Sequence, residues 1–270
     1  MDELDIYLKE DLAEEGDITS NALFTDETSK GSIIAREECV VAGISEIEKI
    51  FKKFDIKFVF HVKDGDFVKK ETKIAEISGR AKDILKIERL SLNIIGRMSG
   101  IATETRKLVE KCKKINPNVQ IAATRKTTPG FRRFEKQAVL IAGGESHRNG
   151  LYDAIMIKDN HLKIVGSLEE AISKAKKNTK SKTIEVEVES KKDAITAAKM
   201  YVDVIMLDNF SSEKAGEAAE EIRRINDKIL IEVSGGITPG NITEYASFAD
   251  RISLGYLTHS VKNIDFSLEI

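Results

Sequence analysis

From Val119 onward, the chain alternates short apolar runs with amphipathic stretches at a spacing of roughly 25 residues. This alternation is typical of βαβ units, in which helices connect and cover parallel strands. Because a complete barrel has eight strands, the pattern predicts an incomplete parallel α/β barrel or a doubly wound sheet. The six apolar runs are Val119–Ala123, Ala154–Ile157, Ile184–Val188, Val202–Leu207, Ile229–Val233 and Ile252–Leu254.

The stretches between these runs carry helix signals. Ser167 followed by Glu170 is a capping box, and Thr238 before Pro239 predicts the start of another helix. Apolar residues at helical spacing form two stripes, which are Leu168, Ala171, Ile172 and Ala175, and Ala215, Ala218, Ala219 and Ile222.

Residues 1–115 follow another pattern, which predicts an antiparallel sheet with helices against it. Apolar and polar residues alternate on both sides of Asp64-Gly65-Asp66, which predicts a β-hairpin. A short helix is expected where Ile47, Ile50 and Phe51 recur, and a long one over 81–112, with a break at Gly96 or Gly100 left open. The tail 260–270 alternates like a half-buried strand that returns to the N-terminal sheet. We therefore expect domains at 1–115, joined by the tail, and at 116–259.

Composition excludes some classes of function. The formal net charge is −2 and the pI about 6.2, so no general basic field favours nucleic acid or an anionic membrane. The acidic start lacks an apolar segment with a cleavage site, and no run is long enough for a membrane span. Cys39 and Cys112 show neither metal-ligand spacing nor a disulfide framework. We expect a cytoplasmic protein that binds neither nucleic acid nor membrane.

Polar groups follow each predicted strand of the second domain. Active sites of parallel barrels lie at the carboxyl ends of the strands, so these groups should meet at one rim. Arginine there suits carboxylate or phosphate, because its guanidinium can donate two parallel hydrogen bonds. The groups are Arg125 and Lys126, Lys158, Glu187, Asp208, Ser234 to Gly236, and Gly255.

Three further signals concern the ligands. Alternation places Glu185, Glu187 and Glu189 on one face of a strand, which is either buried and functional or the wet face of an edge strand. If it is buried, Glu187 with Asp208 could hold a hard cation such as magnesium. The Ser234-Gly235-Gly236 stretch predicts either a phosphate cradle or a plain turn, which uses the same residues. His147 beside Arg148 could meet one carboxylate or phosphate.

The chain also resembles the quinolinate phosphoribosyltransferases over nearly its whole length. The motifs that carry the resemblance are EDLAEEGDITS at 10–20, ERLSLN at 88–93, TRKTTPG at 124–130, EKQAV at 135–139, GGESHR at 143–148, GLYDAIMIKDNH at 150–161, EVEVES at 185–190, LDN at 207–209, SGGIT at 234–238 and LTHS at 257–260.

This resemblance implies an N-terminal α/β sandwich followed by an incomplete α/β barrel, in a homodimer or larger homo-oligomer with active sites shared between subunits. It implies a glycosyltransferase of the pentosyl class in NAD biosynthesis. Quinolinate and 5-phosphoribosyl 1-pyrophosphate would give nicotinate mononucleotide, pyrophosphate and CO2, with Mg2+ as cofactor.

The resemblance also implies roles for individual residues. Quinolinate and nearby phosphate groups would be held by Thr124, Arg125, Lys126, His147, Arg148 and Lys158, and by Arg89 from a neighbouring subunit. Glu187 and Asp208 would serve the ribose and the magnesium pyrophosphate, whereas Ser234, Gly235, Gly236, Gly255, Tyr256 and His259 would line the phosphate end. Lys126, Lys158, Glu187 and Asp208 would be the catalytic groups, with the lysines acting as charges rather than nucleophiles.

Three alternatives stay open. The same fold could serve a nicotinate phosphoribosyltransferase or a molybdenum-transport-associated paralogue. An aldolase could use Lys126 or Lys158 as a Schiff base. A module without catalytic activity could bind nucleic acid or anions through Arg132, Arg133 and Lys136.

Overall fold

A computed structural model describes residues 3–179 and 182–270. The chain forms two compact units, one made of the residues up to 104 together with 261–270, and the other of residues 105–260. The division falls inside helix α4 (Ala81–Lys113), whereas the boundary predicted at 115 lies just beyond the end of that helix. No helix in the described ranges has both the length and the apolar character of a membrane span.

The first unit contains a four-stranded antiparallel sheet. Its order is β12 (Phe266–Glu269), β1 (Thr28–Ala35), β5 (Thr72–Arg80) and β3 (Lys57–Phe60). Strand β12 is the chain's tail, which pairs with β1 and so returns to the N-terminal sheet. Alternate residues of β1 and β5 are buried, and helix α3 (Ile44–Lys53) contributes Ile47, Ile50 and Phe51 to the same core. Two further helices, α1 (Glu3–Leu12) and α2 (Ile18–Leu23), precede the sheet in the chain.

The predicted hairpin around Asp64 is confirmed in part: the stretches on both sides of it pair antiparallel, but no tight turn at Asp64-Gly65 connects them. Strand β3 does pair with β5, but the residues directly after the turn form β4 (Phe67–Val68), which pairs with β2 (Cys39–Val40). The carboxylate of Asp64 accepts the N–H groups of Gly43 and Ile44 at 2.7 and 2.9 Å and thereby caps α3. The Asp-Gly pair therefore serves a helix N-terminus instead of a two-strand turn.

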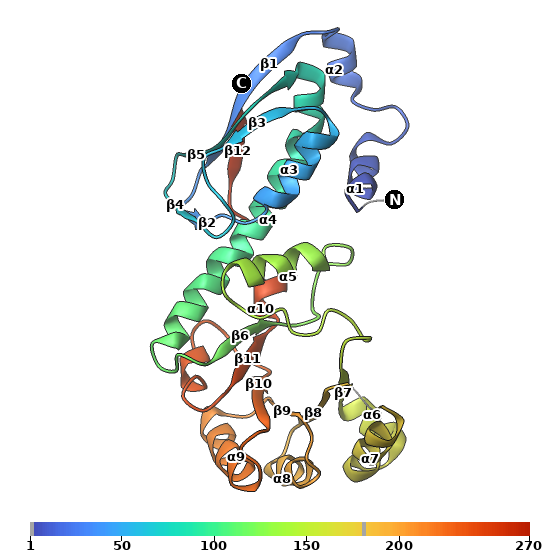
Figure 1. Ribbon diagram of the computed structural model, residues 1–270, viewed down its shortest axis with the longest axis vertical. Coiled ribbons are helices and arrows are strands. Elements are labelled where there is room, and N and C mark those ends of the chain that lie inside the picture. The colour runs from blue at the N-terminus through green and yellow to red at the C-terminus, as the bar shows by residue number, and fades with distance from the viewer. Residues whose placement is uncertain (1–2, 180–181) are drawn as a thin grey trace. The chain divides into compact units, whose positions relative to one another are not determined.

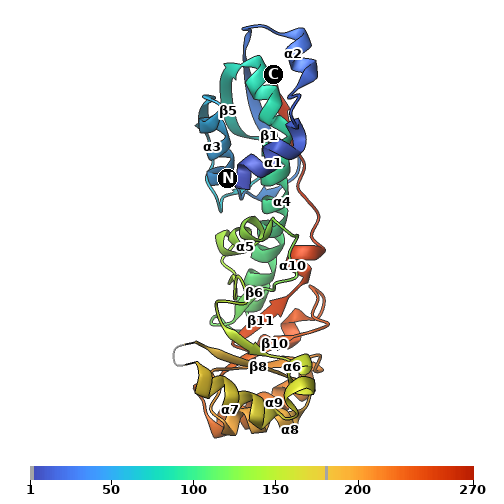
Figure 2. The same ribbon diagram turned by 90° about the vertical axis from the view of Figure 1, so that its right-hand side faces the viewer.

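Helix α4 is continuous through both of its candidate break points, as Figure 2 shows. A Cβ at Gly96 would lie 2.8 Å from the carbonyl oxygen of Ile264, and one at Gly100 would collide with the carbonyl oxygen of Lys262. The glycines thus allow the segment before β12 to approach the helix backbone within this unit.

The second unit is built on a six-stranded parallel sheet, and all six predicted strands are confirmed. Strands β6 and β7 follow each other in sequence but lie at opposite edges, so the ring that would make a barrel is open between them. The sheet order is β6 (Gln120–Ala123), β11 (Arg251–Leu254), β10 (Leu230–Ser234), β9 (Val204–Asp208), β8 (Ile184–Val188) and β7 (Ile155–Ile157).

Helices α7, α8 and α9 lie side by side along the outer side of this sheet (Figures 1 and 2). They pack through small apolar residues such as Ala171, Ala197 and Ala218, and Ser167 caps α7 by accepting the N–H of Glu170 at 3.2 Å. The helical elements of this unit are α5 (Arg132–Ile141), α6 (Asp159–Val165), α7 (Leu168–Asn178), α8 (Lys191–Lys199), α9 (Ser212–Ile225), the 3-10 turn η1 (Ile242–Glu244) and α10 (Tyr256–His259).

Candidate active site

A cavity of about 740 Å³ lies at the carboxyl ends of the six parallel strands. The structure brings nearly all the predicted site residues to it, whereas Arg89 lies on α4 in the first unit and is not among the lining residues. The predicted residues that line the cavity are Thr124, Arg125, Lys126, His147, Arg148, Lys158, Glu187, Asp208, Ser234, Gly235, Gly236, Gly255, Tyr256 and His259.

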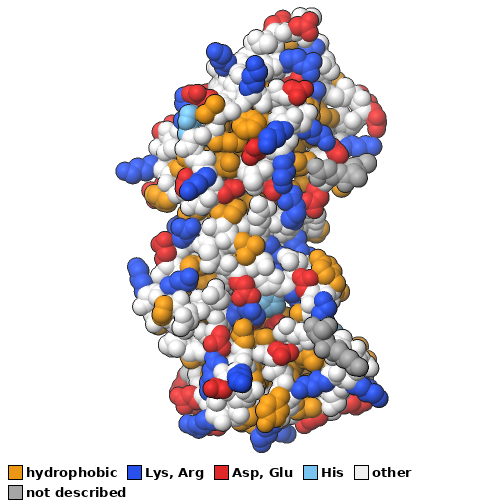
Figure 3. Space-filling view, viewed as in Figure 1, with side chains coloured by type: hydrophobic (Ala, Val, Ile, Leu, Met, Phe, Trp, Pro, Cys, Tyr) orange, Lys and Arg blue, Asp and Glu red, His pale blue; other side chains and the backbone are white. Residues whose placement is uncertain are grey.

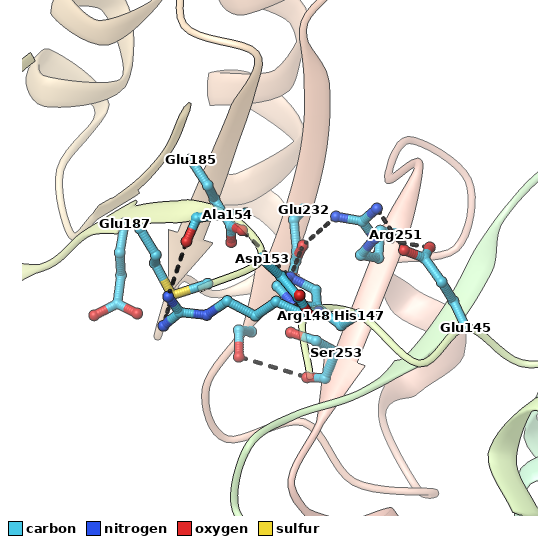
Figure 4. Close-up of polar contacts among 12 residues, drawn as sticks. Glu145, His147, Arg148, Asp153, Ala154, Glu185, Glu187, Glu232, Arg251 and Ser253 are labelled. Carbon is cyan, nitrogen blue, oxygen red and sulfur yellow. Dashed lines mark hydrogen bonds and ion pairs between the residues drawn. The ribbon is translucent and has the colours of Figure 1, made fainter. Parts of the chain in front are cut away.

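One side of the cavity carries two arginines. Arg125 follows β6, and Arg148 comes from the loop before β7. Burial lowers the pKa of Arg148, and the neighbouring charge of Arg125 lowers it further. Within the described residues, the buried Nε of Arg125 has no partner, and the guanidinium of Arg148 donates only to the Ala154 carbonyl at 3.4 Å and the Met156 sulfur at 3.1 Å (Figure 4). These two repelling guanidinium groups form a site for a ligand with more than one negative charge.

Another side of the cavity is acidic. Glu187 lies on β8, where its side chain is 12% exposed and pairs with Lys158. Burial raises the pKa of Asp208, and the negative charge of Glu187 raises it further, so the two carboxylates would gain from a bound cation. The prediction of a wet edge strand is wrong here, because β8 pairs with β7 on one side and β9 on the other.

Glycine residues shape the third part of the cavity. Gly235 and Gly236 both have positive φ angles, of 80° and 62°, and a Cβ at Gly235 would collide with Asn209. A Cβ at Gly255 would lie 2.7 Å from Nε2 of His259. The close approach of backbone that a phosphate cradle needs is therefore present.

The prediction of a helix that starts at Thr238 is wrong. Residues 238–241 form a turn that is followed by the short 3-10 turn η1. The side chain of Asn241 accepts the N–H of Thr238 at 2.8 Å and donates to the Gly236 carbonyl at 3.2 Å. These bonds satisfy the loop locally, so the cradle consists of glycine backbone without the N-terminus of a regular α-helix.

A buried chain of charges, two of whose members, His147 and Glu232, line the cavity, was largely missed from the sequence. His147 Nε2 lies 3.3 Å from Glu185 and 3.2 Å from Glu232, and Arg251 bridges Glu232 to Glu145 (Figure 4). The strand logic that singled out Glu185 applies equally to Glu232, which alternates with apolar residues in β10. That signal could have found Glu232, whereas Arg251 sits at the start of its strand and carried no comparable signal.

The pKa values of the two buried glutamates shift in opposite directions. Burial raises the pKa of Glu185, and the nearby charge of Glu232 adds to the effect. Burial also acts on Glu232, but its pKa is lowered because His147 and Arg251 outweigh burial. Glu232 is therefore the ionised member of the pair, and Glu185 is the one that retains a proton more readily.

Both ring nitrogens of His147 are already occupied by groups of the protein. Burial alone would lower the pKa of His147, but its hydrogen bonds to Glu185 and Glu232 raise it to about 9. The backbone N–H of Arg148 donates to Nδ1 at 2.7 Å, and this bond requires the neutral ring with its proton on Nε2, so the two carboxylates favour the charged ring whereas the Arg148 N–H favours the neutral one. His147 and the two glutamates bring ligand atoms within 4.8 Å of one another, which is close enough for a metal ion. Arg251, however, already supplies a positive charge at Glu232.

The basic run Arg132-Arg133-Lys136 does not form a surface for nucleic acid. Lys136 is only 2% exposed, and the guanidinium of Arg133 lies 4.1 Å from the ring centroid of Phe134. Arg132 donates to Thr127 Oγ1 and to the Asn149 carbonyl, both at 2.9 Å. Figure 3 shows basic and acidic side chains intermixed over the visible face of each unit. These observations disfavour the nucleic-acid alternative.

Comparisons with known proteins agree with this site. Residues 17–99 and 101–269 match the family described as quinolinate phosphoribosyl transferase, N-terminal and C-terminal domain respectively. The chain is 48% identical over 241 residues to a probable nicotinate-nucleotide pyrophosphorylase [carboxylating] of Archaeoglobus fulgidus, covering 88% of this chain and 93% of that protein. It is 46% identical over 262 residues to the protein of the same name in Methanocaldococcus jannaschii, with coverages of 94% and 92%.

Solved structures show the same likeness. The crystal structure of nicotinate-nucleotide pyrophosphorylase from Ehrlichia chaffeensis matches with a TM-score of 0.93 at 38% identity, over 98% of this chain and 96% of that one.

Proposed function

The chain belongs to the quinolinate phosphoribosyltransferase family, and from this premise we propose that it transfers phosphoribosyl from 5-phosphoribosyl 1-pyrophosphate to quinolinate. The products are nicotinate mononucleotide, pyrophosphate and CO2, which makes the enzyme a decarboxylating glycosyltransferase of NAD biosynthesis. The observation that carries the proposal is the single cavity that holds two repelling arginines together with two neighbouring carboxylates. Such a cavity suits a dianionic ring beside a sugar phosphate with its cation.

We assign the two carboxylates of quinolinate to the arginine side of the cavity. Arg125 and Arg148 have donors that protein groups leave open or satisfy weakly, and Thr124, Lys126 and Lys158 stand next to them on the cavity wall. A planar dicarboxylate can accept paired hydrogen bonds from two guanidinium groups. Nicotinate, with one carboxylate, would leave part of this charge unmatched, which favours quinolinate as the substrate.

We assign phosphoribosyl pyrophosphate to the rest of the cavity. Ser234, Gly235 and Gly236 with Gly255 offer backbone to the 5-phosphate, next to Tyr256 and His259. Glu187 and Asp208 suit Mg2+, because their mutual repulsion is relieved by a cation. Bound there, Mg2+ would neutralise the charge that develops on the departing pyrophosphate.

Charge stabilisation and positioning account for the chemistry. As the bond between C1 of the ribose and pyrophosphate breaks, C1 becomes cationic, and the ring nitrogen of quinolinate supplies the electron pair for the new bond. The alkylated nitrogen is positive, so it accepts the electron pair that remains when the adjacent carboxylate leaves as CO2. A proton then adds to the ring carbon that has lost the carboxylate. Lys158 is paired with Glu187, which suits a fixed charge better than the neutral amine that an aldolase needs.

We further propose that the enzyme is a cytoplasmic homodimer or larger homo-oligomer in which Arg89 of one subunit reaches the site of another. This role of Arg89 is the one that the resemblance implies, and Arg89 lies on α4 in the first unit. The two cysteines, Cys39 and Cys112, are unpaired and buried, which agrees with a reducing compartment.

Release of CO2 from carboxyl-labelled quinolinate tests the function. We expect release that requires both phosphoribosyl pyrophosphate and Mg2+ and that a chelator abolishes. Arg148→Ala and Lys158→Ala should each lower kcat/KM by about 100-fold or more, since each removes a charged contact to substrate. The matched control is Lys174→Ala, at an exposed lysine of α7.

Two further results would support the alternatives. Turnover of nicotinate without turnover of quinolinate would instead identify a nicotinate phosphoribosyltransferase. Covalent trapping of a substrate by borohydride at Lys126 or Lys158 would support the aldolase.

A further inference from the structure

Lys136 is a buried charged residue of the second unit to which the proposed reaction gives no role. It lies in the middle of α5 and is 2% exposed. Its ammonium donates hydrogen bonds to the carbonyl oxygens of Ser146 and Arg148, the second at 2.8 Å. One side chain therefore holds the backbone on both sides of His147.

The backbone that Lys136 holds is strained. His147 has a φ angle of 51°, in the left-handed region that is uncommon for residues other than glycine. A strained residue persists only when its surroundings fix it from several directions. The ring of His147 is fixed by Glu185 and Glu232, and the carbonyls on either side of it are fixed by Lys136.

The position of Lys136 costs stability in the absence of a ligand. Burial and the positive charges of Arg132, Arg125 and Arg148 lower the pKa of Lys136 to about 8, with only Asp153 acting in the opposite direction. Hydrogen bonds to two carbonyls are the contacts that the buried ammonium makes in return. A fourth cation placed among three arginines is useful if an anion with several negative charges binds nearby.

We propose that Lys136 is a positioning residue for the anionic substrate: by clamping Ser146 and Arg148 it holds His147 in its left-handed conformation and the Arg148 guanidinium at the cavity wall. Lys136 itself does not line the cavity, so it acts through the backbone and through its charge. This inference rests on the proposed function for its kinetic readout only. The conformation of the loop gives a readout that is independent of turnover.

The test compares Lys136→Met, which keeps the apolar stem and removes all donors, with Lys136→Gln, which keeps one amide group as donor. We expect the KM for quinolinate to rise about tenfold or more in Lys136→Met and by less in Lys136→Gln, while the KM for phosphoribosyl pyrophosphate changes by less than about twofold. Amide hydrogen exchange should accelerate at residues 145–149 and stay unchanged in the strands of the sheet. Lys174→Met, the same change at an exposed lysine of α7, should leave all these values unchanged.

Each outcome bears on the proposal. If Lys136→Met does not fold, Lys136→Gln decides by the same measurements. Wild-type KM for quinolinate in a folded variant, or faster exchange spread over the whole unit, would show that Lys136 is only a structural residue and overturn the proposal. If the wild-type enzyme does not turn over quinolinate, the proposed function fails. Exchange at residues 145–149 and calorimetric binding of quinolinate would then still test the clamp.

Discussion

At the scale of single residues, the site depends on how buried charges are shared. Glu185 and Glu232 both contact Nε2 of His147, yet only Glu232 also pairs with Arg251. The pKa of Glu185 is raised and that of Glu232 is lowered, so Glu185 holds a proton more readily than Glu232 does. The asymmetry follows from one additional cation, since both side chains are almost completely buried.

Replacing each glutamate by glutamine tests this asymmetry. Glu185→Gln should change the free energy of unfolding at neutral pH by less than about 1 kcal/mol, because an amide resembles the protonated acid. Glu232→Gln should cost about 3 kcal/mol, because Arg251 loses half of its buried pairing. Urea unfolding of both variants measures the difference. Equal losses from the two changes would contradict the assignment of charge.

The pH dependence of the free energy of unfolding, compared between the wild type and Glu185→Gln, tests the direction of the Glu185 pKa shift independently. A carboxyl whose pKa is raised by folding stabilises the protein below its unfolded pKa, and this contribution is lost as pH rises through the folded pKa. Wild-type stability should therefore fall relative to the variant as pH rises through that window. Glu189→Gln, at an exposed carboxylate just after the same strand, should show no such relative change.

The residues that sequence reasoning identified are those at strand ends, because one rule places all of them at one rim. Arg125, Lys158 and Asp208 lie together as that rule predicts. The rule gives no sign of which side chain pairs with which. The link between Arg251 and Glu145 joins segments far apart in the chain, and the ammonium of Lys136 is held by carbonyl groups of the loop after its helix; local patterns encode neither kind of contact.

At the scale of elements, the hydrophobic pattern predicted the positions of the strands better than it predicted which strands pair with each other. Each of the six parallel strands was visible as an apolar run because the sheet buries both of its faces. The pairing of β4 with β2 was not visible, since Asp64 caps α3 and only the folded unit shows this. Similarly, the side chain of Asn241 satisfies the backbone of Thr238 and Gly236, and a turn forms where a helix was expected after Thr238.

Glycines in two helices should respond oppositely to alanine. Gly100→Ala should destabilise the protein by about 1–3 kcal/mol, because the new methyl group meets a backbone carbonyl that can move only with the chain. Gly216→Ala in α9 should stabilise it by about 0.5–1 kcal/mol, because alanine favours a helix and its Cβ would lie 3.7 Å from Phe248, an ordinary contact. Thermal or urea unfolding measures the sign of the stability change in both variants. A stabilised Gly100→Ala variant would show that Gly100 serves no close backbone contact.

At the scale of the whole molecule, Arg89 distinguishes a site completed within one chain from a shared one. All the other predicted site residues line one cavity of the second unit, whereas Arg89 belongs to the first. The resemblance implies that the Arg89 guanidinium comes from a second copy of the chain, and this stays a prediction. Sharing of this kind makes activity depend on assembly, because a lone subunit would lack one cation for the dicarboxylate.

Mixing two inactive variants tests the shared site. Arg89→Ala and Lys158→Ala homo-oligomers should each lose most activity, the first by loss of the incoming cation and the second by loss of a cavity charge. After dissociation and random reassociation, a dimer would regain up to about a quarter of wild-type sites, because each hybrid then holds one site with both residues intact. Quinolinate turnover before and after mixing measures the recovery. Chains that carry both changes are the control. A hybrid of such a chain with either single variant holds no site in which both Arg89 and Lys158 are intact, so these mixtures should recover no activity. Activity that fails to recover in mixtures shown by mass spectrometry to contain hybrids would show that Arg89 does not complete the site of another subunit, and an active Arg89→Ala homo-oligomer would place Arg89 outside the site.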